Sequence, residues 1–544
     1  MAMLIAKDSS LLNASLKTAR FLENKGDIDA AIIIYKDIIQ ENPYHHIAAQ
    51  RLNSIFTTHK RYKEGIAFLE MRINVQPNNY KLFSELGEYH YLNGQEDVAF
   101  SIWNDASTKF KNNRSYYRQM LTIYSKYGLD DSIDEILDDG RKRFGKAFLS
   151  YESGVYYQAK GAYDKSMDQF ILNLIHEPRQ AGMIERRILL MSDKEEAIPI
   201  IDKKLTNFSK IFPLKLLNIT SEYHFKKQNY SEAYKYKLKW VLLDKKGHKE
   251  LIKFGNQLRE ENQFKFSMDA YEFILKHSAE PKIKGKALLE MAKTFEKQIV
   301  PLNQEYLIPY FYDENIFFKN PFQIHSLISE KHLKTSLELY DSVLVSLDDS
   351  PILSEAYFKL GEIHYKILQD FDKAYFLLNQ SLSKNDDKSF REKVLISITD
   401  VLIAQGEMEL ALELVQKELG NNISPKLNMR KILIHFLKNN SDYTLDVIDS
   451  TMLTIESNSN LLNDLMELKS IIERYYSNSS IDKAAFTHFL KAENYLRMKK
   501  LGDAINELVF INNNFIDSKV LPLANMRLSL LYFKLNDFQM ALET

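Results

Sequence analysis

Hydrophobic positions along the chain recur with the spacing of amphipathic helices rather than with the alternation of strands. In residues 12–45, Ala31, Tyr35 and Ile38 follow one another at intervals of four and three. Such intervals place apolar side chains on one face of an α-helix. A second amphipathic stretch precedes them, and the polar turn Lys25–Asp27 separates the two. The pattern predicts two antiparallel helices joined by a tight turn.

The pattern returns with a fixed period of 34 residues. Pro43 and Pro77 are 34 apart, and so are Gly94 and Gly128. A constant period of this length is typical of a stacked-repeat architecture. Two helices of roughly 14 residues cannot bury their apolar faces alone, so each pair is expected to stack on the next pair.

Small residues occupy particular places within each period. Residues 86–106 contain Gly87, Gly94, Ala99 and Ala106. Glycine inside a helix costs roughly 1 kcal/mol relative to alanine, so it needs a structural reason. We expect Gly87 and Ala99 to lie where two helices cross closely. We expect Gly94 to end the first helix in a left-handed conformation.

The 34-residue period with small and aromatic residues at fixed places resembles the tetratricopeptide repeat family. The resemblance implies an all-α fold, a right-handed superhelical solenoid of antiparallel helix pairs, with about 14 units. Further copies of the pattern contain Gly154, Tyr157, Gly161, Phe170 and Pro178; Tyr230 and Ala233; Gly361, Phe371 and Ala374; Gly406 and Ala411; and Asp537, Phe538 and Ala541. Segments 181–212 and 423–482 keep the helical periodicity but lack the small residues.

One segment interrupts the period. Residues 304–323 hold seven aromatic residues and two prolines, and helical periodicity returns over 329–344 with Ser336 and Tyr340 in the usual places of a second helix. We therefore expect an insertion within one repeat. The predicted organisation is an N-terminal solenoid over 1–297, an aromatic-rich insertion over 298–331, and a C-terminal solenoid over 332–544 whose last repeat is incomplete.

The aromatic residues of the insertion have two interpretations. Tyr310, Phe311, Phe317 and Phe318 either fold back onto the solenoid's own groove or form an exposed anchor for a partner. Aromatic side chains bury large areas and are frequent at binding hot spots, so both interpretations are physically reasonable.

The family resemblance also implies a binding groove lined by first-helix positions. Carried onto this sequence, those positions are Gln50, Lys81, Glu88, Tyr91, Arg118, Tyr151 and Gln158. Their mixed charge and interleaved tyrosines suit an extended polar peptide. The family's carboxylate-clamp variant expects Lys and Asn on the first helix, where this chain has Leu16 and Arg20, so that variant is disfavoured.

Composition and motifs argue against most other functions. The chain has 72 Lys and Arg against 73 Asp and Glu, which disfavours nucleic acid as a partner. It has no cysteine, and no window reaches the ~18 apolar residues of a membrane span. The sequence Gly140–Ala147 resembles a phosphate-binding loop but has alanine where Ser or Thr would hold magnesium. We expect no catalytic, cofactor-binding or metal-binding residue and no enzymatic activity.

The sequence therefore predicts a protein–protein interaction scaffold that binds a peptide or protein in its concave groove. The later repeats, over 515–542, look like those of bacterial envelope and outer-membrane-assembly lipoproteins, which favours the bacterial periplasm over the cytoplasm. The alternative is a repeat-bearing subunit or fragment of a larger enzyme. Because Thr544 closely follows Ala541, we expect a truncated last repeat whose uncapped end could self-associate.

Overall fold

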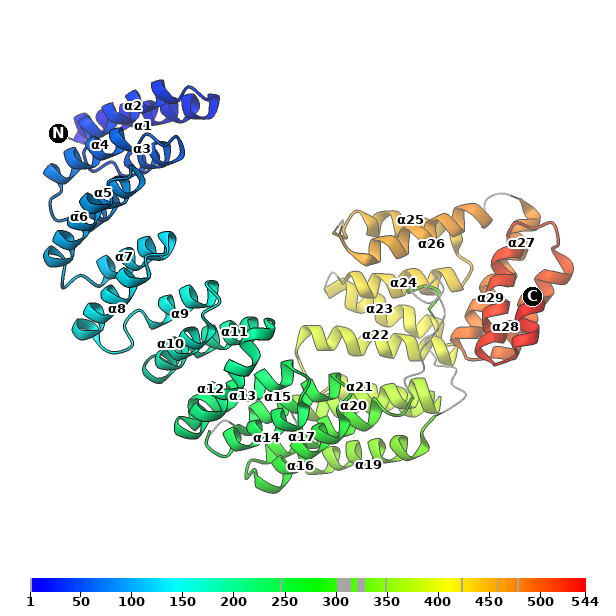
Figure 1. Ribbon diagram of the computed structural model, residues 1–544. Helices are drawn as coiled ribbons and strands as arrows, with labels where there is room; N and C mark the ends of the chain where they lie inside the picture. The colour runs from blue at the N-terminus through cyan, green and yellow to red at the C-terminus, as the bar shows by residue number, and fades with distance from the viewer. Residues whose placement is uncertain are drawn as a thin grey trace. The chain divides into compact units, whose positions relative to one another are not determined.

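The computed structural model describes residues 2–244, 247–300, 315–319, 328–347, 350–421, 424–456, 458–476 and 479–544. These ranges contain α-helices and short helical turns and no β-strand (Figure 1). The fold is all-α and consists of helix pairs in a tetratricopeptide-like arrangement, as predicted. Contacts divide the chain into two compact units, unit 1 (Met1–Asn229) and unit 2 (Tyr230–Thr544). The three segments expected from the sequence, 1–297, 298–331 and 332–544, stay a prediction.

Unit 1 is built mainly from consecutive helix pairs. The two helices of each pair, α1/α2, α3/α4, α5/α6, α7/α8 and α9/α10, pack on each other, and α5 also contacts α7, as α9 contacts α11, so these first helices lie side by side. The helices are α1 (Ala2–Lys25), α2 (Ile28–Glu41), α3 (His46–Thr58), α4 (Tyr62–Val75), α5 (Tyr80–Leu92), α6 (Glu96–Lys109), α7 (Arg114–Tyr127), α8 (Asp130–Phe144), α9 (Ser150–Ala159), α10 (Tyr163–His176), η1 (Pro178–Gln180), α11 (Ala181–Met191), η2 (Glu195–Ala197), α12 (Ile198–Ile211) and α13 (Pro213–Lys226).

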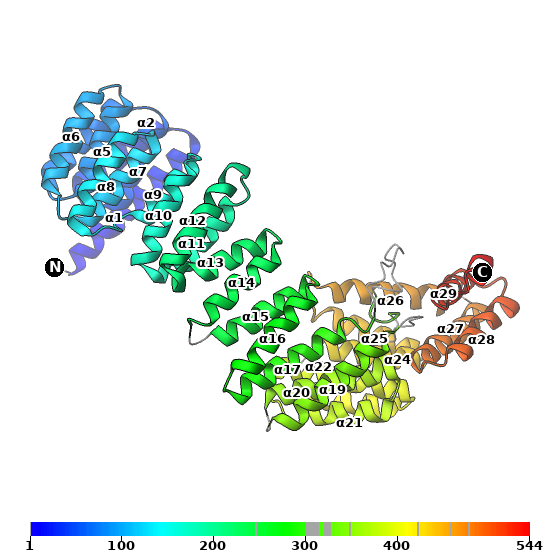
Figure 2. The ribbon, with the colours of Figure 1, turned by 60° about the horizontal axis from the view of Figure 1, so that its bottom comes forward.

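Unit 2 repeats the same packing, and Figure 2 shows its helix pairs from a second direction. One helix, α26, is additional, because α24 contacts both its partner α25 and the later first helix α27. The helices are α14 (Tyr230–Val241), α15 (Gly247–Glu260), α16 (Phe264–His277), α17 (Pro281–Glu296), α19 (Glu330–Ser346), α20 (Pro351–Ile363), the π-helical turn η3 (His364–Leu368), α21 (Phe371–Leu382), α22 (Lys388–Gln405), α23 (Met408–Asn421), α24 (Pro425–Leu437), α25 (Ser441–Met452), α26 (Asn460–Tyr476), α27 (Ser480–Arg497), α28 (Leu501–Asn514), α29 (Leu521–Lys534) and α30 (Phe538–Glu543).

Glycines at the helix crossings leave room for an aromatic ring of the paired helix. A Cβ added to Gly87 would lie 2.6 Å from Cδ1 of Trp103, and one added to Gly154 would lie 2.6 Å from Cε1 of Phe170. Ala99, on the facing helix, is fully buried. The prediction that close crossings require small residues at Gly87 and Ala99 is confirmed.

The turns between paired helices adopt the left-handed conformation that the sequence predicted. Gly94 has φ 78° and Gly128 has φ 69°. The turn one period earlier does the same at Lys60, with φ 54°, although lysine has a Cβ. Left-handed backbone costs an ordinary residue about 1–2 kcal/mol, so the turn is set by helix packing and not by the residue type alone.

The repeat that contains the insertion closes as predicted. Helix α19 packs against α17 across the interruption. The hydroxyl of Ser336 donates to the carbonyl oxygen of Ala292 at 3.0 Å, and the hydroxyl of Tyr340 donates to the carboxylate of Glu296. The two segments without small residues differ more from the regular pattern. Segment 181–212 is interrupted by η2, and segment 423–482 contains the additional helix α26. Within the described ranges, no helix combines the length and apolarity needed to cross a bilayer.

Candidate functional site

The predicted groove residues all lie on first helices of unit 1. Lys81 and Arg118 are exposed, as is Gln50, whereas the other four are half-buried. They are distributed as Gln50 on α3; Lys81, Glu88 and Tyr91 on α5; Arg118 on α7; and Tyr151 and Gln158 on α9.

Two of these residues are engaged between neighbouring helices. Glu88 accepts hydrogen bonds from Lys126 Nζ at 2.9 Å and from the hydroxyl of Tyr127 at 2.8 Å. The ring of Tyr91 lies 4.9 Å from that of Tyr127 and 6.1 Å from that of Trp103. Glu88 and Tyr91 therefore join α5 to α7 and contribute to the rigidity of the face.

Two others, Arg118 and Tyr151, line one cavity of about 650 Å³ in unit 1. Helices α7, α9, α10 and α11 and the turn after α8 surround it. The complete lining is Arg114, Arg118, Phe144, Gly145, Lys146, Ala147, Phe148, Leu149, Tyr151, Glu152, Asn173, His176, Glu177, Gln180 and Met183. This cavity is the candidate site.

Two basic side chains of the lining, Arg114 and Arg118, are exposed. Arg118 Nε donates to Glu152 Oε1 at 2.9 Å, yet the Arg118 side chain remains 59% exposed. The guanidinium of Arg114 lies 4.9 Å from the centre of the Phe148 ring, a cation–π contact that restricts its position. A planar guanidinium at an open site can bind a carboxylate through two hydrogen bonds.

Two amide side chains, those of Asn173 and Gln180, also line the cavity. Asn173 Nδ2 donates to Ser150 Oγ at 3.0 Å, which fixes the orientation of this side chain. Asn173 Oδ1 and Gln180 Oε1 are buried and have no hydrogen-bond partner among the described residues. Leaving a buried acceptor unpaired costs roughly 1–3 kcal/mol, so these two oxygens are unfavourable features of the packing beside the cavity.

The near-match to a phosphate-binding loop adjoins this cavity. Gly140 lies inside α8, which ends at Phe144, and Lys146 belongs to the turn that lines the cavity. The motif therefore spans the end of a helix at a repeat boundary. A phosphate-binding loop instead follows a strand and opens a helix.

Sequence reasoning missed a group of charged residues in unit 2, here called the ionic cluster: Arg259, Lys286, Glu290, Lys293 and Glu355. Glu290 lies 2.8 Å from Arg259 Nη1, 3.0 Å from Lys286 Nζ and 3.1 Å from Lys293 Nζ. Lys286 also lies 3.1 Å from Glu355. A cavity of about 500 Å³ adjoins the cluster. The positions 286, 290 and 293 share one face of α17, a signal that the sequence did carry.

The ionic cluster is largely neutralised from within. Although burial acts to raise it, the neighbouring Lys293, Lys286 and Arg259 lower the pKa of Glu290 to about 2. Only 2% of the Glu290 side chain is exposed. Since its charges are compensated inside unit 2, the cluster serves the packing of α15, α17 and α20. The exposed arginines of unit 1 are better placed for a partner.

The residues of the aromatic insertion divide into two groups. Phe317 and Phe318 are buried in unit 2, with 1% and 0% of their surface exposed. For these two the structure has the arrangement expected when the insertion folds onto its own solenoid. Tyr310 and Phe311 lie outside the described residues.

A family model supports the repeat interpretation in two segments of the chain. A model of the tetratricopeptide repeat matches residues 13–43 and 355–387, which lie within the α1/α2 and α20/α21 regions. No curated protein sequence matches the chain. The structure of Naa15/Naa10 bound to HypK-THB is similar over 98% of this chain and 82% of that one, with 12% identity and a TM-score of 0.35. The crystal structure of yeast Tom70 is similar over 86% of this chain and 98% of that one, with 12% identity and a TM-score of 0.33.

Proposed function

We propose that this protein is a non-enzymatic scaffold that binds an extended, acidic or polar peptide segment of a partner protein in the unit 1 cavity. Stacked helix pairs present extended faces that repeat proteins use for binding. The cavity offers exposed guanidinium groups, which suit the acidic side chains of a peptide.

One observation carries the proposal: Arg118, Tyr151 and Asn173 line the same cavity although they come from three different helices. Arg118 already holds a carboxylate, that of Glu152, in the lining of the cavity. A partner's Asp or Glu can replace Glu152 at little cost, because exposed ion pairs contribute only about 0–1 kcal/mol.

The experiment is selection of a random peptide library on the purified chain, followed by affinity measurement on variants. We expect the selected peptides to be enriched in Asp and Glu. Arg118→Ala should weaken their binding by up to about fivefold, because an exposed ion pair contributes at most about 1 kcal/mol.

Arg143→Ala is the matched control. Arg143 is paired with Asp139 on α8 at 2.9 Å and does not line the cavity. Equal effects of the two substitutions, or selected peptides without acidic residues, would show that the cavity is not the binding site.

The compartment is part of the same proposal. We place the protein in the bacterial envelope, with a role in assembly there. The resemblance of residues 515–542 to envelope repeat proteins supports this, as does the absence of cysteine, which avoids unwanted disulfides in an oxidising compartment. The cytoplasm is the alternative, and fractionation of cells that express the native gene distinguishes the two.

The second candidate function is a repeat-bearing subunit of a larger enzyme. Repeat arrays can position a catalytic domain as readily as a binding partner. Purification of the native protein from its cells would decide between the two, because an enzyme subunit would co-purify with an activity that a scaffold lacks.

We also propose that the protein self-associates through α30, where Phe538 and Leu542 are exposed.

A further inference from the structure

Residues 315–319 form a single capped turn between α17 and α19. The amides of Phe318 and Lys319 donate to the carbonyl oxygen of Asn315 at 3.1 and 2.8 Å. The amide of Phe317 donates to Asn315 Oδ1 at 2.9 Å. A turn this short leaves its later carbonyl oxygens without partners inside the turn. Here the carbonyl groups of Ile316, Phe317 and Phe318 are met by side chains from distant helices.

Two buried arginines donate to those carbonyl groups. Arg497 Nη2 lies 2.8 Å from the oxygen of Phe317 and 3.3 Å from that of Ile316. Arg527 Nη2 lies 2.9 Å from the oxygen of Phe318. Arg527 is itself held by Glu493, with distances of 2.7 and 2.9 Å to the two carboxylate oxygens. The arginines therefore donate to the main chain of the turn.

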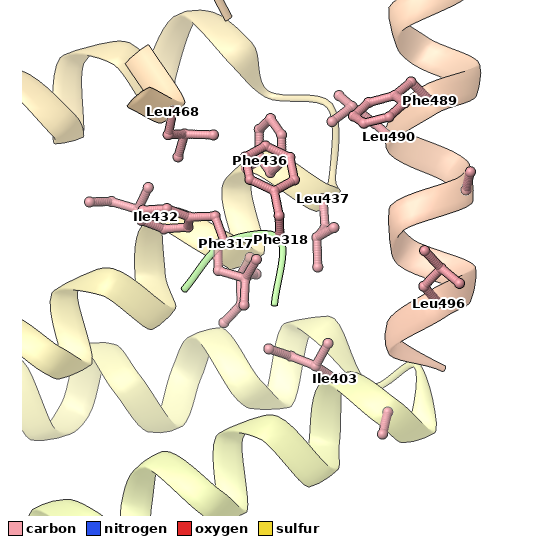
Figure 3. Close-up of a cluster of buried hydrophobic side chains, with 14 of the residues drawn as sticks. Phe317, Phe318, Ile403, Ile432, Phe436, Leu437, Leu468, Phe489, Leu490 and Leu496 are labelled. Atoms are coloured by element: carbon pink, nitrogen blue, oxygen red, sulfur yellow. The ribbon is translucent and has the colours of Figure 1, made fainter. Parts of the chain in front are cut away.

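The side chains of the turn enter apolar surroundings. The Phe318 ring lies 5.8 Å from the ring of Phe436 on α24 and 6.5 Å from that of Phe489 on α27. Figure 3 shows Phe317 and Phe318 among apolar side chains of α22, α24, α26 and α27, including Ile432 and Leu468. Two adjacent aromatic rings in such a setting have the composition of a binding hot spot.

The first residue of the turn is also recognised. Asn315 Nδ2 donates to Glu467 Oε2 at 2.9 Å and to the carbonyl oxygen of Asp464 at 3.2 Å. The amide of Ile316 donates to the carboxylate of Asp464 at 3.3 Å. Both acidic residues lie on α26, the helix that the regular repeat does not require.

These contacts have the form of a receptor that holds a ligand. Residues from α24, α26, α27 and α29 converge on a five-residue turn that belongs to no helix of the repeat. We propose that this face is a second binding site, specific for a turn with the pattern Asn-x-Phe-Phe. Residues 315–319 occupy it in cis, and a partner protein that carries the same pattern takes their place.

A partner's turn can take the place of residues 315–319 because of the contacts that hold them. Main-chain carbonyl groups are the same in every protein, so Arg497 and Arg527 bind another chain's turn equally well. Residues 315–319 compete with the partner's turn for the site, because they are a ligand joined to the same chain. The effective concentration of such a ligand is of millimolar order when the connection is short. This second site lies in unit 2. If it binds no partner, the proposal that the unit 1 cavity binds a peptide is unaffected, and the reverse also holds.

The first test uses the peptide DENIFFKNP, which is the sequence 313–321, carrying a fluorescent label. Binding is measured by anisotropy to the full chain and to its Phe317→Ala/Phe318→Ala variant. The Phe317→Ala/Phe318→Ala variant should bind the peptide at least about tenfold more tightly than the native chain. The reason is that a larger fraction of the variant molecules has the site open to the peptide. The peptide DENIAAKNP should bind neither protein. A folded double variant that does not bind DENIFFKNP, or equal binding to both proteins, would overturn the proposal.

The second test does not require the double variant to fold. Lys319 is exposed and the chain has no cysteine, so Lys319→Cys provides a single position for a spin label. Excess unlabelled DENIFFKNP should narrow the lines of the spectrum as the turn leaves its site, and DENIAAKNP should not. An unchanged spectrum at saturating peptide would show that 315–319 is a permanent part of the core, and the proposal would be wrong.

Discussion

Replacing Glu290 by glutamine tests the electrostatics of unit 2 most sharply. The substitution keeps the size and shape of the side chain but removes the charge that faces Arg259, Lys286 and Lys293. Loss of one partner from a buried ion pair is strongly destabilising, because the remaining charges stay buried without compensation. We expect Glu290→Gln to lower the free energy of unfolding of unit 2 by roughly 3–5 kcal/mol at pH 7.

The pKa of Glu290 gives an independent value for the same interaction. Burial acts to raise the pKa, but Lys293, Lys286 and Arg259 outweigh it and lower the pKa from 4.5 to about 2. This difference corresponds to roughly 3 kcal/mol, at 1.36 kcal/mol for each pH unit. Because the folded pKa is lowered, the stabilisation is complete above pH 4.5 and is lost as the pH falls towards 2.

The assay is hydrogen exchange of the α17 amides, measured for both proteins at matched pH values between 7 and 2. Exchange reports local opening, which suits a long repeat array that does not unfold in one step. The variant should exchange much faster than the native chain at pH 7. The difference should shrink as the pH falls below 4.5 and disappear only near pH 2, since Glu290 is then protonated and resembles glutamine.

A difference that stays constant with pH would refute this reasoning, since it would show that the loss comes from packing and not from charge. Lys253→Gln provides a control, because its ion pair with Glu250 is exposed and should contribute little.

Four further substitutions test the packing and titration of unit 1. Gly154→Ala should lower the free energy of unfolding by ~1–3 kcal/mol, because the added Cβ would lie 2.6 Å from Phe170. Gly182→Ala places its Cβ in open space on α11 and should raise the free energy of unfolding by up to ~1 kcal/mol. Urea titration measures both changes. Lys60→Gly should stabilise by roughly 0.5 kcal/mol by relieving the left-handed backbone, and an unchanged melting temperature would contradict this. Burial raises the pKa of Glu85 to about 7, so the stability of unit 1 falls as the pH rises from about 4.5 to 7. Glu85→Gln should therefore stabilise unit 1 by roughly 1–3 kcal/mol at pH 8 but not at pH 4.

The repeating part of the fold could be predicted because its determinants are local. The separation of Gly154 from the ring of Phe170 is fixed by one helix–turn–helix pair, and the same spacing recurs for Gly87 and Trp103. Helix α19 was predicted across the interruption for the same reason, since Tyr340 occupies its usual place within the second helix.

The contacts that could not be predicted join residues far apart in the sequence. The hydrogen bond from Arg497 to Phe317 spans 180 positions, and no local pattern indicates that partner. The ionic cluster joins Glu290 to Arg259 of another repeat. In the candidate site, the sequence identified Arg118 and Tyr151 through the family resemblance. It missed Asn173, which lies on a second helix and outside the positions carried over.

The central claim is that a partner peptide occupies the unit 1 cavity, and site-specific photocrosslinking tests it most directly. The photoreactive phenylalanine derivative p-benzoylphenylalanine replaces Tyr151 in one protein and Tyr44, which is exposed outside the cavity, in a control. A peptide selected on the native chain should crosslink at position 151 and not at 44, and Arg118→Ala should reduce the yield. Equal crosslinking at the two positions, or crosslinking at 44 alone, would contradict the assignment of this cavity as the binding site.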